Sequence, residues 1–454
     1  GFLHTDIHED LLNKTAEILQ SGNGRISLIL NDQELVTVLP FGHPMLGLAV
    51  DLGTTKLAAF LVDLQSGATL ASGGALNPQV AYGEDVISRI QYADEHQGGA
   101  KELQQCVVKS INDLAADLAE KAGTTSEEIV DCVVVGNTAM HHLLVGLPVH
   151  NLGTAPYQPA RLDAMLLNAR DIGLNLALNA SLYLPPNIAG FVGGDHVAML
   201  LAMQARHTLK TVLALDIGTN TEISLLHKGR HLACSCASGP AFEGAHIRHG
   251  LRAIPGAIER VLIDGEKINV QTIEGRPAVG ICGSGIVDAV AGMRRAEMIN
   301  SRGAFNKDHK GLTLLEGKAE LLLVPASQSG TGYDITLDRQ DVQQVQLAKA
   351  AIRSGIEILL REAAVSAEDI DLLLVAGAFG TYLDMANCQH IGLLPEVPQE
   401  RIRQMGNAAG TGAREMLVST LKRSEAEAML NQIEYVELTT VKDYVDFYTD
   451  AISL

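Results

Sequence analysis

An aspartate that leads into a turn of glycine and hydroxyl-bearing residues occurs twice in this chain. Residues 51–55 read Asp-Leu-Gly-Thr-Thr, and residues 216–220 read Asp-Ile-Gly-Thr-Asn, with the aspartates 216 − 51 = 165 positions apart. Glycine permits a sharp turn, and the N–H groups and hydroxyls of such a turn can surround phosphate oxygens. A carboxylate beside the turn can hold hydrated Mg²⁺. A β-hairpin turn would explain either copy alone, but the pair favours two phosphate-binding turns.

These turns define the first set of candidate ligands. We expect Asp51 and Asp216 to hold the metal ion and to take part in catalysis. Apolar residues precede each aspartate and follow each turn, so we expect each turn to join two strands. The residues expected to contact the phosphates are Gly53, Thr54, Thr55, Lys56, Gly218, Thr219 and Asn220.

Two further stretches place small or polar residues directly after a predicted strand. The apolar run Ile129–Val135 leads to Asn137, and the run 371–375 leads to small residues at 376–378. Ligands of α/β proteins bind at the carboxyl ends of strands, and small residues there would let an adenine lie against the backbone. The candidate nucleotide contacts are Asn137, Gly377, Ala378 and Phe379.

Other features are open to two interpretations each. The glycine-bearing turns at 237–245 and 280–285, the second with Gly283 and Ser284, permit either close approach to a nucleotide or tight strand-to-helix packing. Asp195 begins an apolar helix and is either an N-cap or the carboxylate that orients a water toward a γ-phosphate.

Two helix starts carry side chains with possible chemistry. Residues 84–89 include Glu84, Asp85 and Arg89, which could contact a substrate, although helix capping and a solvated face explain them as well. His141 and His142 follow on another predicted helix. Because adjacent helical residues point to different sides, we expect packing histidines rather than a paired metal site.

Composition excludes several classes of function. With 454 residues and a net charge of −19, the chain is expected to form at least two domains and not to bind nucleic acid, which requires a basic face. No apolar run approaches the ~20 residues that span a bilayer and no signal sequence is visible, so we expect a cytoplasmic protein without membrane contact. The six scattered cysteines indicate buried thiols rather than disulfides or a metal site.

The remaining sequence divides into a few expected segments. Residues 1–45 read as the tail of a small preceding domain. The others are long helices at 99–121 and 341–362, an irregular insertion at 147–185, a polar excursion with strands at 300–335, and a small-residue helix from 406 suited to close helix contact.

Five stretches, in this order, resemble the ATPase superfamily of actin, sugar kinases and heat-shock chaperones. They are 48–63 and 212–226 as the two phosphate motifs, 133–146 and 406–415 as the connecting segments, and 373–380 as the adenosine motif. The resemblance implies an α/β, two-lobed actin-like ATPase fold that binds ATP and Mg²⁺ and closes around the nucleotide.

The same resemblance implies a domain division. Duplicated ribonuclease H-like lobes are expected at 46–205 and 206–454, with a small α+β remnant at 1–45. The C-terminal helices could pack back on the first lobe.

Within that superfamily, the chain is similar to the reductive activators of corrinoid proteins. The runs that carry this similarity are 50–56, 77–90, 136–142, 216–222 and 280–285. Such proteins use ATP to help transfer an electron from an iron–sulfur cluster to a cobalamin in the Co(II) state. The resemblance implies a corrinoid protein of an anaerobic methyltransferase or O-demethylase system as partner. It places the [2Fe–2S] cluster in an N-terminal ferredoxin-like domain that this sequence does not contain. A homodimer is left open.

Three other functions stay open. A small-molecule kinase of the same fold would need an acceptor pocket with a catalytic carboxylate. An activator of an acyl-CoA dehydratase would hold a [4Fe–4S] cluster through paired cysteines of a dimer. A nucleotide-dependent assembly module would bind ATP without turnover.

Overall fold

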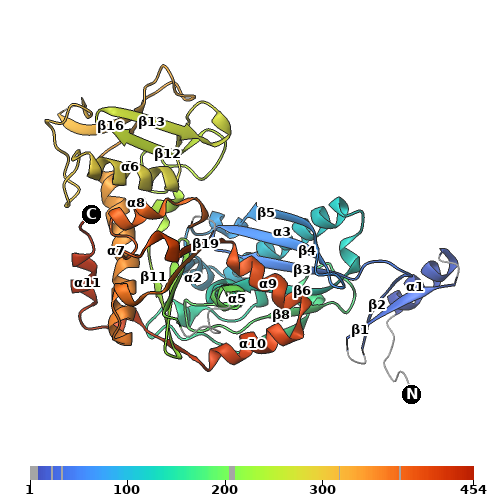
Figure 1. Cartoon of the computed structure of the whole chain (residues 1–454). Coiled ribbons are helices and arrows are strands. Elements are labelled where there is room, and N and C mark those ends of the chain that lie inside the picture. The colour runs from blue at the N-terminus through green and yellow to red at the C-terminus, as the bar shows by residue number, and fades with distance from the viewer. Residues whose placement is uncertain (1–8, 22–23, 32–33, 204–209, 316, 378–379) are drawn as a thin grey trace. The chain divides into compact units, whose positions relative to one another are not determined.

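The computed structural model describes residues 9–21, 24–31, 34–203, 210–315, 317–377 and 380–454 (Figure 1). The chain folds into two compact units, each of helices and strands. The first comprises Gly1–Gln204 and Ala408–Gln432, and the second comprises Ala205–Asn407 and Ile433–Leu454. Each unit is therefore assembled from two separate stretches of sequence.

A six-stranded sheet of order β5-β4-β3-β6-β8-β7 forms the centre of the first unit. β3, β4 and β5 are an antiparallel meander, and β6 runs parallel to β3. β3 is buried along nearly its whole length, which explains its continuous apolar run. The bounds are β3 Leu46–Leu52, β4 Lys56–Asp63, β5 Thr69–Leu76, β6 Ile129–Gly136, β7 Met165–Asn168 and β8 Ser181–Leu184.

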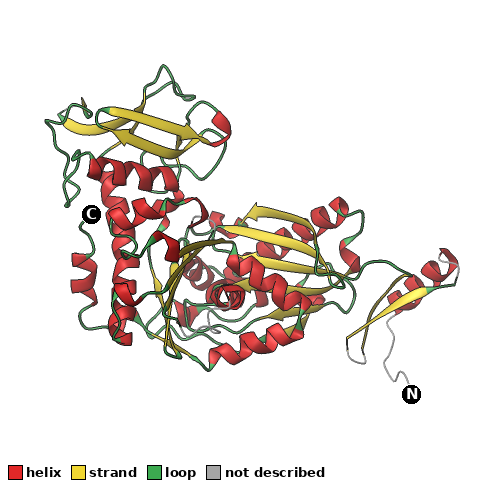
Figure 2. Cartoon of the chain, viewed as in Figure 1, coloured by secondary structure: helices red, strands yellow, loops and turns green. Residues whose placement is uncertain are grey.

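Helices pack on both faces of this sheet (Figure 2). A Cβ on Gly73 of β5 would contact Leu118 of α3 (Gly99–Lys121), whereas one on Gly47 of β3 would contact Leu417 of α9 (Ala408–Val418). α9 also touches α5 (Gly194–Met203) so closely that a Cβ on Gly412 would lie 2.0 Å from the Ala198 carbonyl oxygen. The predicted close helix contact is confirmed. The other helices here are α1 Glu9–Ser21, α2 Val86–Glu95, α4 Thr138–Val145 and α10 Thr420–Leu430.

The stretch 147–185 is not simply the irregular insertion that we predicted. It contributes β7 and β8, and β8 pairs in parallel with β6, which extends the central sheet. These strands have four residues each, too few for a clear local pattern, and their pairing depends on distant sequence. The described residues before 46 include α1 and an antiparallel pair of strands, β1 (Ile26–Asn31) and β2 (Glu34–Pro40).

The second unit has its own six-stranded sheet, of order β19-β18-β9-β10-β11-β20. β18 runs parallel to both β9 and β19, and α7 (Arg339–Ala363) packs on β10 and β11. The parallel strands bring the end of β9 beside the end of β18. The bounds are β9 Val212–Ile217, β10 Thr221–His227, β11 Arg230–Cys236, β18 Leu372–Ala376, β19 Ile402–Gly406 and β20 Ile433–Tyr435.

Two three-stranded sheets complete this unit. One joins β12 (Ala257–Asp264), β13 (Lys267–Thr272) and β14 (Gly280–Ile281), on which α6 (Gly283–Arg295) packs. The predicted polar excursion at 300–335 contains two strands of the other sheet, and the third strand begins at its end. The strands of that sheet are β15 Thr313–Leu315, β16 Lys318–Val324 and β17 Ile335–Leu337. The second unit also contains the helices α8 Met385–His390 and α11 Tyr444–Asp450. In the part of the chain that the structure describes, no helix is long and apolar enough to cross a membrane.

Candidate functional site

The first aspartate turn lies at the carboxyl edge of the first unit's sheet. In the parallel pair β3 and β6, Asp51 is opposite Val135 and Leu52 is opposite Gly136. Parallel strands end at a common edge, so the turn 53–55 and the start of α4 are neighbours there. Asp51 is only partly buried, whereas Lys56 is exposed. The sheet thus brings together the first phosphate candidate and the first connecting segment.

Residues 77–89 support this turn from behind. The Asn77 side chain donates to the Gly53 carbonyl at 2.9 Å, and the Arg89 guanidinium donates to the Thr54 carbonyl at 2.5 Å. Both side chains are buried, with 1% and 0% of their surface exposed. Asp85 is the N-cap of α2 with a capping box to Ser88, so the capping interpretation holds for Asp85. It does not hold for Arg89, which points into the protein and not toward solvent.

Asn137 contacts the turn with its side chain. Its amide nitrogen donates to the Thr54 hydroxyl oxygen at 2.9 Å, and its side-chain oxygen accepts from the Met140 backbone N–H as the N-cap of α4. Because the Thr54 oxygen is the acceptor, its hydroxyl hydrogen can turn toward another acceptor, such as a phosphate. Asn137 therefore orients a candidate ligand, and its own contact with a nucleotide stays a prediction.

Asp195 lies in the first turn of α5, within the same unit. The helix start is pressed against the turn after β6, since a Cβ on Gly193 would lie 2.4 Å from the Gly136 carbonyl oxygen. One Asp195 carboxylate oxygen accepts from the neighbouring His196 backbone N–H at 2.8 Å. Asp195 is inside the first turn of the helix and is not its N-cap. The structure thus brings it near the edge where Asp51 and Asn137 lie, and its role with water stays a prediction.

His141 and His142 are buried on α4, but they do not point to different sides. Their Nδ1 atoms are 3.2 Å apart, and the Arg161 backbone N–H donates to His142 Nε2. The premise that adjacent side chains point to different sides was wrong, because side-chain rotation lets the two imidazoles meet, but their burial fits the expected packing role. Burial lowers the pKa of His141 to about 3 and that of His142 to about 4, so both rings are neutral.

The second aspartate turn lies at the equivalent edge of the second unit. Ala376 of β18 is opposite Asp216 of β9, and it is also opposite Gly406 of β19. Gly377 follows at φ +92, where a Cβ would lie 2.5 Å from the Ile217 carbonyl oxygen and 2.7 Å from an Asp216 carboxylate oxygen. Only glycine lets these strand ends approach so closely. Ala378 and Phe379, the other adenosine candidates, lie outside the described residues.

Two residues from the 237–245 turn contact the second phosphate candidate. The Ser238 hydroxyl lies 3.4 Å from the Gly218 carbonyl oxygen and 3.3 Å from that of Thr219. The Thr219 hydroxyl donates to a carboxylate oxygen of Glu243, at the end of the short helix Pro240–Glu243. A second carboxylate therefore lies beside the turn that Asp216 introduces.

The turn at 280–285 packs tightly on its own sheet. A Cβ on Gly285 would lie 2.4 Å from the Ile258 carbonyl oxygen of β12, and the Ser284 hydroxyl donates to the Glu259 carbonyl at 2.9 Å. Both Gly283 and Ser284 are buried. This geometry fits the packing interpretation, while their contact with a nucleotide stays a prediction.

Four residues hold these turns in a role that the sequence did not predict: Asn77, Arg89, Ser238 and Glu243. The sequence left Arg89 between substrate contact and a solvated helix face. Its position four residues after the Asp85 N-cap, on the side of buried Val86 and Ile90, is a usable signal of its burial. Glu243 lies in the glycine-bearing stretch 237–245, whose role the sequence left open, and its partner Thr219 is 24 residues away.

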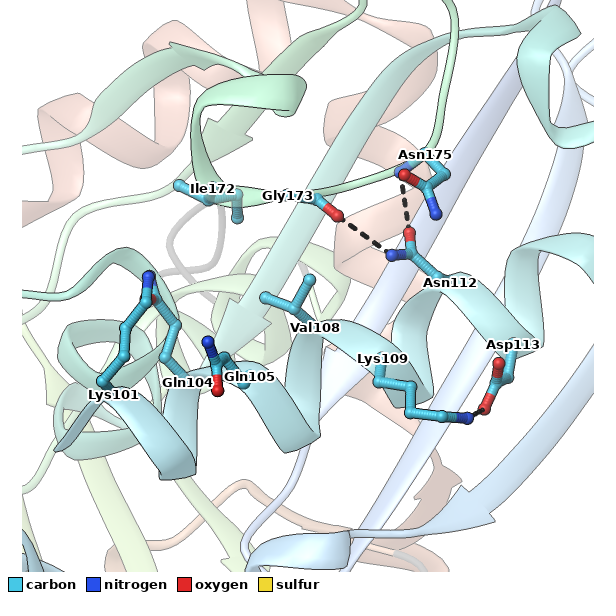
Figure 3. A pocket seen from close by; sticks show the side chains of 10 residues that line it. All are labelled: Lys101, Gln104, Gln105, Val108, Lys109, Asn112, Asp113, Ile172, Gly173 and Asn175. Carbon is cyan, nitrogen blue, oxygen red and sulfur yellow. Dashed lines mark hydrogen bonds and ion pairs between the residues drawn. The ribbon is translucent and has the colours of Figure 1, made fainter. Parts of the chain in front are cut away.

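A shallow surface pocket in the first unit contains none of the predicted site residues (Figure 3). It lies between α3 and residues 172–175. Asn112 bonds both the Gly173 carbonyl and the Asn175 N–H, and Lys109 pairs with Asp113 at 2.6 Å. Its polar groups thus serve local structure.

The cysteines do not fit an iron–sulfur cluster. All six are free thiols, and only Cys106 is not fully buried. Cys234 and Cys236 lie in the core of the second unit, where the Cys236 sulfur would be 2.4 Å from a Cβ on Gly355. Among the described residues there is no cluster of three or more His, Cys, Asp and Glu side chains that could hold a metal. No step can be assigned to a cluster in this part of the chain.

Two family descriptions match successive parts of the chain. Residues 46–208 match the RACo middle region, and residues 210–454 match the C-terminal domain of RACo, the ASKHA domain. The fold class implied by the resemblance of the five stretches, the ASKHA type of actin, sugar kinases and heat-shock chaperones, is confirmed.

Similar proteins match along nearly the whole chain. Corrinoid activation enzyme RamQ of Eubacterium limosum is 34% identical over 439 residues, which are 94% of this chain and 74% of RamQ. The [Co(II) methylated amine-specific corrinoid protein] reductase of Methanosarcina barkeri is 25% identical over 442 residues, 90% of this chain and 77% of the reductase. The solved structure of a reductive activator for a corrinoid, iron–sulfur protein is similar at 34% identity, with a TM-score of 0.88 over 98% of this chain and 73% of the other.

Proposed function

The chain belongs to the RACo family, and from this membership we propose that it is an ATP-dependent reductive activator of a corrinoid protein. In this function, ATP binding and hydrolysis are coupled to the reduction of Co(II) to Co(I) in a partner of an anaerobic methyl-transfer system. The observation that carries the proposal is the 34% identity to a corrinoid activation enzyme over 94% of the chain.

We propose that the two units are the lobes of the ATPase and that each contributes a phosphate-binding turn. The close approach at Gly377 supports the assignment of the second turn, because it places the Asp216 carboxylate beside the carboxyl end of β18. Asp51 and Asp216 would hold Mg²⁺ through water, and bound Mg²⁺ would neutralise phosphate charge. Asp195 would orient the attacking water, and the turns 53–55 and 218–220 would bind the phosphates.

Reduction of Co(II) to Co(I) requires a shift of a thermodynamic equilibrium. A protein that binds the Co(II) state so as to remove a cobalt ligand makes reduction easier, and each 1.4 kcal/mol of binding free energy shifts an equilibrium about tenfold. Hydrolysis of ATP would then release the complex. We assign the electron to a donor group outside the described residues, whose cysteines do not fit a cluster.

The test mixes the chain with a purified corrinoid protein in the Co(II) state and a titanium(III) reductant that supplies one electron per cobalt. We expect a stable complex without nucleotide and its dissociation on addition of MgATP. The Co(I) absorbance should grow only when both the chain and MgATP are present. Asp216→Asn is expected to keep the complex and lose its response to ATP. A complex indifferent to ATP, or none, would refute the proposal.

The same preparation separates the alternatives. A kinase would transfer the γ-phosphate to a small molecule, whereas we expect only inorganic phosphate. An assembly module would show no turnover. A dimeric protein that contains iron would favour the dehydratase activator. Cytoplasmic location and the homodimer remain predictions.

A further inference from the structure

We propose that Asn77 and Arg89 are positioning residues that shape residues 53–55 into an anion-binding turn before a nucleotide arrives. This inference rests on the proposed function and extends it, because it assigns a role to buried residues outside the turn.

Three successive carbonyl oxygens of the turn are each held by this pair. The Gly53 oxygen accepts from the Asn77 side chain at 2.9 Å, the Thr54 oxygen from Arg89 at 2.5 Å, and the Thr55 oxygen from the Asn77 backbone N–H at 2.9 Å. Asn77 supplies two of these donors, and Arg89 bonds to the neighbouring Gln79 at 3.3 Å. The donors therefore lie together, behind the turn.

The direction of the carbonyls sets the direction of the N–H groups. In a planar trans peptide the C=O and the following N–H point in opposite directions. Each carbonyl that bonds to Asn77 or Arg89 thus directs the N–H of the next residue away from that pair. These N–H groups belong to Thr54, Thr55 and Lys56. Successive N–H groups that converge on one side form the concave nest that binds anions.

The support behind the turn is rigid and positively charged. Arg89 also donates to the Gly83 carbonyl at 2.9 Å, and the Met140 sulfur accepts from both Arg89 and Asn77 at 3.3 and 3.7 Å. The planar guanidinium reaches several acceptors at once, which a lysine ammonium on a flexible stem cannot do. Its charge is buried close to the turn, where it favours an anion more than it would in water.

The test compares Arg89→Lys with wild type by calorimetric titration with MgATP and by thermal unfolding without nucleotide. Titration reports the dissociation constant and the fraction of competent protein separately. A positioning role predicts that Arg89→Lys raises the dissociation constant roughly tenfold to a hundredfold at an unchanged stoichiometry. A merely structural role would lower the stoichiometry and leave the dissociation constant unchanged.

Arg423→Met is the matched control in the same unit. Arg423 is also largely buried and also donates to a main-chain carbonyl, that of Met416, at 2.8 Å. We expect this variant to unfold at a lower temperature and to keep the wild-type dissociation constant for ATP.

A second variant covers the case in which Arg89→Lys does not fold. Asn77→Ser keeps an oxygen that can accept from the Gln79 N–H but loses the donor to Gly53, and it should raise the dissociation constant roughly fivefold. If the substituted proteins that fold bind ATP as tightly as wild type, the inference is wrong. If the wild-type chain itself does not bind ATP, the proposed function is wrong, and the inference that rests on it is wrong as well.

Discussion

The substitution Gly377→Ala tests whether the second aspartate turn needs close contact with the end of β18. The added Cβ would lie 2.5 Å from the Ile217 carbonyl oxygen and 2.7 Å from an Asp216 carboxylate oxygen. Real Cβ atoms essentially never lie closer than 3.0 Å to such atoms. The first atom is backbone and cannot move alone. The Asp216 carboxylate must therefore rotate, or the two strand ends must separate.

The expected loss of stability has two parts. An L-residue at positive φ costs about 1–2 kcal/mol, and overpacking adds about 1–3 kcal/mol. Gly229 is the matched control, because it has φ +82 in the same unit and nothing within 4 Å of a Cβ, so Gly229→Ala carries only the first part. The difference of about 1–3 kcal/mol corresponds to about 2–12 °C in the unfolding midpoint of a unit of this size.

The decisive measurement is the affinity for ATP with and without Mg²⁺. We expect Gly377→Ala to weaken MgATP binding at least tenfold, about 1.4 kcal/mol, because Asp216 is displaced. The affinity of Gly229→Ala should stay within twofold of wild type. Wild-type MgATP affinity in Gly377→Ala would refute the reasoning that the close contact at residue 377 places the Asp216 carboxylate for binding the metal and nucleotide.

Three more outcomes are expected. Arg423→Met should lower the free energy of unfolding by about 3–5 kcal/mol in denaturant titrations, since Asp131, whose pKa burial raises, loses its ionic partner. Burial lowers the pKa of His141 to about 3 and that of His142 to about 4, from 6.5. The unfolded chain therefore binds more protons, and the free energy of unfolding falls as the pH drops below about 6.5. When both histidines are changed to glutamine, the unfolding midpoint should fall less between pH 7 and pH 5. Glu243→Ala removes the acceptor of the threonine hydroxyl in the second turn and should weaken MgATP binding roughly fivefold in titrations, with little change in the unfolding midpoint.

Local patterns predicted most of the elements that carry the two turns. The strands around Asp51 and Asp216 follow from continuous apolar runs. The small residue at 377 was expected to leave room for an adenine, whereas the structure shows that Gly377 lets two strand ends approach closely. What failed depended on distant partners. The burial of Arg89 requires the turn at 53–55 to lie over it, and β8 is a strand because β6 is beside it. Neither partner is visible in a window of sequence.

The two turns are alike in sequence but are held differently. Behind the first turn, a buried amide and a buried guanidinium hold the carbonyls of Gly53 and Thr54 at 2.9 and 2.5 Å. At the second turn, the Ser238 hydroxyl lies 3.4 and 3.3 Å from two carbonyl oxygens, and the Thr219 hydroxyl donates to the Glu243 carboxylate. Hydrogen bonds from charged donors are roughly twice as strong as those between neutral groups. The main chain of the first turn is therefore held by a charged donor, whereas the charged group at the second turn is the Glu243 carboxylate, which accepts from the Thr219 side chain.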